Sequence, residues 1–113
     1  MVTTEKDIKI TRGDTFGFNF DIKDGEGLEP TLDAVYFSVK ETPEDDDYIF
    51  QKTLTNGITR LTGGGYYVRI DPSDTQDLDK DKYYYDLQVN IDDDVYTPLK
   101  GKLDIRWDIT REA

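Results

Sequence analysis

The stretch Tyr83–Ile91, which reads YYYDLQVNI, decides the fold class of this chain. Every second position holds a large apolar or aromatic side chain, and the positions between them are mostly polar. Because side chains of a β-strand point alternately to its two faces, this pattern predicts a strand with one buried face. The predicted inward row is Tyr83, Tyr85, Leu87, Val89 and Ile91.

The same alternation recurs along most of the chain, so strands dominate the prediction. Shorter strands are expected around 8–10, 48–54, 58–61 and 95–99, and only residues 71–78 leave room for a helical turn, capped by Asp71 or Ser73 beside Pro72. The further inward rows are Phe16, Phe18, Phe20 and Ile22; Val35, Phe37 and Val39; Tyr66, Val68 and Ile70; and Leu103, Ile105, Trp107 and Ile109.

Turn residues separate these strands. Asn56-Gly57 predicts a two-residue hairpin, and Asp92–Asp94 predicts a second hairpin after Ile91. Further turns are expected at 24–27 and at Gly63–Gly65, while Pro98 and Gly101 indicate a bulge or an edge position in the return strand. This order of short strands and turns therefore predicts a two-sheet sandwich.

The segment from Asp79 to Tyr85 has the spacing of the corner between strands E and F of immunoglobulin-like domains. Tyr83 would be the corner tyrosine, with its hydroxyl bonded to backbone near Asp79, and Tyr85 would occupy the position of the second cysteine in antibody domains. The alternative is an aromatic strand start in another kind of sandwich. We therefore expect an all-β, immunoglobulin-like antiparallel two-sheet β-sandwich of about seven to nine short strands, one domain over 1–113 with its core at about 8–110.

Composition narrows the function classes. The chain has 113 residues, 14 Lys+Arg and 25 Asp+Glu, hence a formal net charge of −11. It contains no His and no Cys, which excludes disulfides, thiolate nucleophiles, imidazole bases and His/Cys metal sites. The negative charge argues against nucleic acid and anionic membranes as partners. No signal peptide or membrane-spanning run is recognisable.

The acidic clusters are predicted to be solvated turns. EF-hand registers beginning at Asp77 or Asp21 lack required ligands, which leaves adventitious calcium as the alternative, and no metal or cofactor is expected. Arg12-Gly13-Asp14 matches an adhesion tripeptide, but it lies where the chain needs a glycine turn. Among 25 acids some carboxylate pair will have glycosidase spacing by chance, so no catalytic residues are predicted.

Three tyrosines point away from the predicted core. Tyr36, Tyr67 and Tyr84 alternate with inward residues, so they would lie on outer faces. They could form a platform for a sugar or a protein, since tyrosine is enriched at interfaces. Ordinary cross-strand packing on a half-solvated sheet is the alternative.

The order of several motifs resembles the N-terminal domain of phage baseplate upper proteins and related short immunoglobulin-like structural proteins of phages and prophages. The similarity covers roughly residues 8–110. It is carried by Ile-x-Ile-Thr-Arg-Gly-Asp-Thr with the aromatic strand after it (8–20), Ala-Val-Tyr-Phe-Ser-Val-Lys (34–40), Asp-Thr-x-x-Leu (74–78), Tyr-Tyr-Tyr-Asp-Leu (83–87) and Gly-x-Leu-x-Ile (101–105).

The resemblance implies a non-enzymatic docking module of the virion, typically at the tail baseplate, assembled in the bacterial cytoplasm. It implies other tail or baseplate proteins as partners, with self-association open. The C-terminal region that trimerises and carries receptor-binding proteins in that family is not present in these residues, and the family supplies no catalytic residues. A carbohydrate-binding or surface-adhesion sandwich is the alternative.

Overall fold

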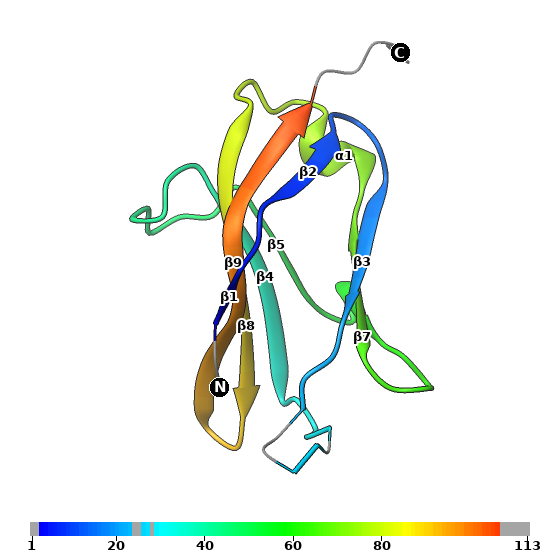
Figure 1. Cartoon of the computed structure of the whole chain (residues 1–113). Helices are drawn as coiled ribbons and strands as arrows, with labels where there is room; N and C mark the ends of the chain where they lie inside the picture. The colour runs from blue at the N-terminus through cyan, green and yellow to red at the C-terminus, as the bar shows by residue number, and fades with distance from the viewer. Residues whose placement is uncertain (1–2, 24–25, 28, 107–113) are drawn as a thin grey trace.

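The computed structural model describes residues 3–23, 26–27 and 29–106, and strands dominate them (Figure 1). The all-β prediction is therefore confirmed. Trp107, Ile109 and the turn residues 24 and 25 lie outside the described residues. The elements are β1 (Thr4–Glu5), β2 (Ile8–Thr11), β3 (Phe16–Phe20), β4 (Ala34–Lys40), β5 (Phe50–Leu54), β6 (Gly57–Arg60), β7 (Tyr66–Ile70), α1 (Pro72–Thr75), β8 (Lys82–Ile91) and β9 (Asp94–Arg106).

Hydrogen bonds link these strands into one curled sheet in the order β1-β9-β8-β4-β5-β6-β7-β3, with β2 also paired to β9. The sheet is mixed: β1 and β2 run parallel to β9, and β5 runs parallel to β6. This arrangement differs from the expected pair of antiparallel sheets, because hydrogen bonding passes between the layers through β5 and β6. Figure 1 shows β3 and β7 standing apart from the layer of β4, β8 and β9.

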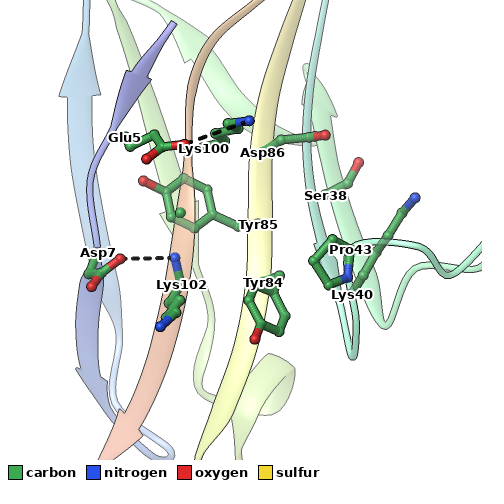
Figure 2. A pocket seen from close by; sticks show the side chains of 11 residues that line it. Glu5, Asp7, Ser38, Lys40, Pro43, Tyr84, Tyr85, Asp86, Lys100 and Lys102 are labelled. Atoms are coloured by element: carbon green, nitrogen blue, oxygen red, sulfur yellow. Dashed lines mark hydrogen bonds and ion pairs between the residues drawn. The ribbon is translucent and has the colours of Figure 1, made fainter.

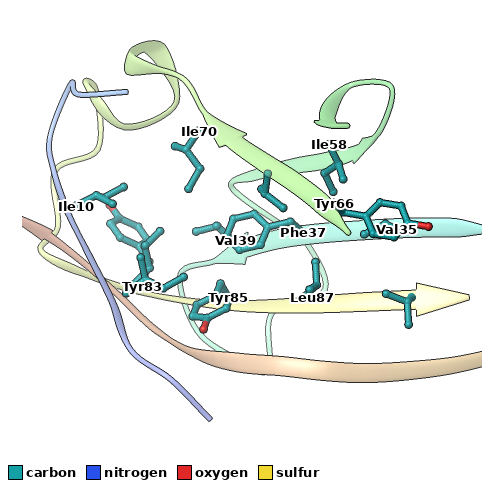
Figure 3. Close-up of a cluster of buried hydrophobic side chains, with 14 of the residues drawn as sticks. Ile10, Val35, Phe37, Val39, Ile58, Tyr66, Ile70, Tyr83, Tyr85 and Leu87 are labelled. Atoms are coloured by element: carbon teal, nitrogen blue, oxygen red, sulfur yellow. The ribbon is translucent and has the colours of Figure 1, made fainter. Parts of the chain in front are cut away.

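The core lies between these two layers and is built from the inward rows (Figure 3). Phe37 on β4 is fully buried, and its ring centroid lies 5.6 Å from that of Phe18 on β3, a strand to which β4 is not hydrogen-bonded. The described members of the predicted rows are confirmed as buried or as packed against the core. The fully buried or nearly buried apolar residues of β4 and β8 are Val35, Phe37, Val39, Tyr83, Tyr85, Leu87 and Val89.

The hairpin between β8 and β9 is confirmed. Asp92 and Asp93 have φ of 48° and 72°, and Ile91 pairs with Asp94, as in a two-residue type I′ turn. Between the pairs Leu87–Leu99 and Val89–Tyr96, β9 uses one residue more than β8. The bulge expected from Pro98 is thus present, because proline cannot donate a ladder hydrogen bond.

The hairpin predicted at Asn56-Gly57 is wrong. The residues with positive φ are Thr55 (68°) and Gly57 (96°), which are not adjacent as a type I′ turn requires. The chain instead makes a compact loop, in which Thr55 N–H donates to Ile58 O over 2.9 Å, and enters the other layer. There β6 pairs antiparallel with β7.

An inward lysine ties the edge of one layer to α1. Lys52 on β5 is only 8% exposed, and its Nζ lies 2.7 Å from Asp74 Oδ2 and 3.4 Å from Asp71 Oδ2. Asp71, one of the two predicted caps, is the N-cap of α1, and its backbone N–H donates to the Asp74 carboxylate over 2.7 Å. The buried ammonium is therefore compensated, as burial of a charge requires.

Gly101 marks the place where the N-terminal segment crosses β9 between β1 and β2. A Cβ added at Gly101 would lie 2.1 Å from the Lys6 carbonyl oxygen, and Lys6 N–H donates to Lys100 O over 2.9 Å. The Lys6 carbonyl also accepts a hydrogen bond from the Tyr85 hydroxyl at 2.5 Å. Glycine at this position is what lets the two backbones approach.

We expect Gly101→Ala to lower the free energy of unfolding by about 1–3 kcal/mol, because the new methyl group forces the two backbones apart. Gly63→Ala is the matched control, since a Cβ there would meet nothing within 4 Å. Urea denaturation followed by tryptophan or tyrosine fluorescence measures both variants. Equal stability changes in the two variants would show that this contact does not constrain the fold.

Candidate functional site

The outward side chains of β9, β8, β4 and β5 form one continuous surface, here called the outer face. Residues paired across neighbouring strands lie on the same side of a sheet, so the register arranges them in rows. One row is Lys102, Tyr84 and Lys40; the next is Lys100, Asp86, Ser38 and Gln51; the third is Gln88, Tyr36 and Thr53.

Two adjoining hollows lie on the outer face. The first, of about 330 Å³, is lined by Tyr84 and Asp86 of β8, by residues of β4 and β9, by Glu5 and by Pro43 (Figure 2). The second, of about 320 Å³, contains Tyr36 and Tyr48. Both hollows share a lining of Ser38, Lys40 and Asp86, so they form one irregular depression across β9, β8, β4 and β5.

Polar contacts hold several lining side chains in place. Gln51 Nε2 donates to Ser38 Oγ over 2.9 Å, and Lys40 Nζ donates to the Asp45 carbonyl over 2.7 Å. Lys100 and Glu5 form an ion pair of 3.7 Å across β9 and β1. The side chains of β4, β5 and β9 are therefore positioned by neighbours within the same face.

Asp86 is the most perturbed acid of the outer face. Burial raises the pKa of its carboxyl, and the positive charges of Lys40 and Lys100 partly oppose that rise. In the register Lys100 stands between Glu5 and Asp86. The two carboxylates are thus separated by a cation instead of facing one another across a cleft.

The tyrosines proposed as an interaction surface do not come together as a set of three. Tyr36 and Tyr84 share the outer face, four residues apart in the paired register, or about 13 Å. Tyr67 lies on β7 in the other layer, where its ring covers Gly17, whose added Cβ would lie 2.0 Å from the Tyr67 hydroxyl. Only the first two can belong to one site.

The loop 41–49 contributes residues that the alternation did not indicate. Tyr48 and Ile49 are 52% and 41% exposed although both are large and hydrophobic. Ile49 donates its N–H to Val39 O and directly precedes the Phe50–Val39 pair, so it stands beside Lys40 on the outer face. In the sequence, these residues could have been noticed as two neighbouring hydrophobic residues that belong to none of the predicted inward rows.

Asp79, Tyr83 and Tyr85 occupy the start of β8 and the loop before it. The Tyr83 ring is 2% exposed, and its hydroxyl accepts a hydrogen bond from the Lys80 backbone N–H at 3.2 Å, one residue after Asp79. Asp79 itself is exposed. Tyr85 packs against Phe37, with ring centroids 5.4 Å apart. Tyr83 and Tyr85 thus contribute to the packing of this corner.

The Arg12-Gly13-Asp14 segment forms a turn between β2 and β3. Gly13 has φ of 81°, and its N–H donates to Thr75 Oγ1 over 2.9 Å. Arg12 donates from its guanidinium to the Lys80 carbonyl over 2.9 Å, so its side chain is directed to the protein itself. In residues 3–23, 26–27 and 29–106, no group of three or more Asp or Glu side chains could hold a metal ion.

No known protein family has a sequence profile that matches this chain, and no curated protein is significantly similar to it. Within the part of the chain that the structure describes, no helix is both long and apolar enough to cross a membrane.

The Tyr85 hydroxyl makes the free energy of unfolding depend on pH in the alkaline range. Burial, with a smaller contribution from the negative charge of Asp7, raises the pKa of its hydroxyl from 10.0 to about 12. The folded state thus favours the neutral phenol, so its contribution is complete below pH 10.0 and is lost as pH rises through about 12. We expect the free energy of unfolding to fall over that interval.

Urea unfolding at a series of alkaline pH values measures this fall. Tyr85→Phe removes the ionisable hydroxyl and should flatten this part of the profile, whereas the control Tyr84→Phe should retain it. A Tyr85→Phe profile parallel to that of the unsubstituted protein would contradict the assignment.

Proposed function

We propose that this protein is a non-enzymatic structural protein of a phage or prophage, a docking module of the tail-baseplate type that assembles with other virion proteins. The single observation that carries the proposal is the outer face. It combines tyrosines, an exposed isoleucine and two open hollows on one layer of neighbouring strands. Such a combination of aromatic groups and concave surface suits a protein partner.

The fold proposed with this function is an immunoglobulin-like sandwich joined at one edge. The strands β4, β8 and β9 correspond in order to C, F and G, and β3, β7 and β6 correspond to B, E and D. The strand β5 then extends the first layer, as an additional strand does in variable-type domains. The hydrogen bond from Lys80 N–H to the Tyr83 hydroxyl supports this correspondence, because the corner tyrosine of such domains bonds to backbone a few residues upstream.

The chemistry of the outer face supports a binding role over catalysis. The chain has no His or Cys to act as base or nucleophile. The row of Glu5, Lys100 and Asp86 places a lysine between the two carboxylates, whereas hydrolysis of a glycoside needs them on either side of the scissile bond. The side chains of this face can instead bind a partner through shape complementarity, hydrogen bonds and charge.

Mass spectrometry of purified virions tests the proposal. The protein should be present in particles, and Tyr48→Ser should reduce the incorporated copies because it removes a 52% exposed aromatic group from the outer face. Val95→Ser is the control, since Val95 is 60% exposed but lies at the far end of the outer face, beside the β8–β9 turn, and lines neither hollow. Particles without this protein, or equal incorporation of the two variants, would contradict the proposal.

Carbohydrate binding is the second candidate, favoured by the placement of Tyr36 and Tyr84 on one face with a hollow beside each. Tyrosine rings at such a spacing could stack on two sugar units of a chain. A glycan array should then show a ligand, and Tyr84→Ala should weaken its binding while Tyr67→Ala, in the other layer, should not. An array without any bound glycan would remove this candidate.

A further inference from the structure

Several cationic side chains of this acidic protein have no partner among the described residues, and most of them lie close together. Acids outnumber bases by 25 to 14, so a shortage of carboxylates cannot explain an unpaired lysine. Eight of the described cations bond to a carboxylate, a carbonyl or a hydroxyl: Arg12, Lys23, Lys40, Lys52, Arg60, Arg69, Lys80 and Lys100. The cations whose side-chain nitrogens have no hydrogen-bonding or ion-pairing partner among the described residues are Lys6, Lys9, Lys82, Lys102 and Arg106.

Four of these cations surround the carboxylate of Asp104 on the outer side of β2, β9 and β8, and a second carboxylate, that of Asp7, accepts a hydrogen bond from the Lys102 backbone N–H at 3.2 Å. Asp104 on β9 pairs with Lys9 on one side and with Lys82 on the other. Lys102 and Arg106 lie two residues before and after Asp104 on the same face, at about 7 Å along the strand, while neighbouring strands are about 5 Å apart. We call Lys9, Lys82, Lys102 and Arg106, with Asp104 at their centre, the basic patch.

With Asp7 counted beside Asp104, the basic patch has a local formal charge of 4 − 2 = +2, so the rest of the chain carries −11 − 2 = −13. All four cations are exposed. The acids outside the patch lie largely in turns and loops, such as 44–47 and 92–94. Charges interact over only about 8 Å at physiological ionic strength. A partner in contact with the patch therefore meets a positive surface although the molecule as a whole is strongly negative.

We infer that the basic patch docks a carboxylate-rich segment of a partner protein; this inference rests on the proposed docking function and names the chemistry of its partner. Charge complementarity identifies the partner as anionic, because four exposed cations beside the two carboxylates of Asp104 and Asp7 leave two positive charges to be matched. Like charges held this close together are tolerated best when a partner neutralises them.

Two features favour a protein over a phosphate polymer. Three of the four cations are lysines, which lack the planar fork with which arginine binds phosphate in a bidentate manner. The patch is also continuous with the apolar part of the outer face, since Tyr84 pairs with Lys102 and with Lys40, beside which the exposed Ile49 stands. Burial of an isoleucine side chain against the apolar groups of a protein is favourable, whereas a polyanion has no apolar surface that would cover it.

Backbone amide NMR titration with a synthetic peptide of alternating glutamate and threonine tests the inference. Chemical shift changes should concentrate on β2, β8 and β9 and should vanish with the matching glutamine–threonine peptide. Lys102→Glu should weaken peptide binding by roughly five- to tenfold, since it removes one attraction and adds one repulsion. Lys23→Glu is the matched control, because it gives the same net charge, 13 − 26 = −13, from an exposed lysine outside the patch.

The control should retain its affinity within about twofold, as expected for a distant screened charge. Equal weakening by both substitutions, or shift changes spread over the whole molecule, would overturn the inference. Tighter binding of inorganic polyphosphate than of the glutamate peptide would overturn the choice of a protein partner. Loss of peptide binding in a protein that still enters virions would leave the docking function intact and reject only the acidic partner.

Discussion

The pairing of β8 on both of its sides is the constraint on which the rest of the structure depends. It forms seven consecutive residue pairs with β4 and a long antiparallel hairpin with β9. A shift of one residue in either register would exchange the buried row beginning at Tyr83 with the outward row beginning at Lys82. The same strand thus supplies the centre of the core and the centre of the outer face, so one register determines the side chains of both.

Period-two alternation was sufficient to identify the buried rows, because the alternation of apolar and polar residues within a single strand shows which of its two faces is buried. The turn at Asp92-Asp93 was also predictable, since its two residues adopt the left-handed conformations that a two-residue hairpin needs. Asn56-Gly57 was misleading because the positive φ angles fall at Thr55 and Gly57. The local sequence allowed a hairpin, and packing of β6 against β7 selected another path.

Features that depend on contacts between segments far apart in the sequence could not be predicted from the alternation of residues within one segment. Lys52 faces inward because carboxylates of α1, about 20 residues further along the chain, compensate its charge. Tyr67 is separated from Tyr36 and Tyr84 because the β5–β6 connection carries the chain into the other layer. The hollows of the outer face likewise depend on the loop 41–49, whose position no periodicity specifies.

The parallel pairing of β2 with β9 has a consequence for the order of folding. Ile8 pairs with Leu103, so this contact joins residues about 95 positions apart and closes a loop that contains nearly every other strand. Contacts of such high sequence separation are entropically costly to form early. On the ribosome β1 and β2 emerge first but have no partner until β9 has been synthesised. We therefore expect β1 and β2 to pair with β9 last, after the sheet of the other strands has formed.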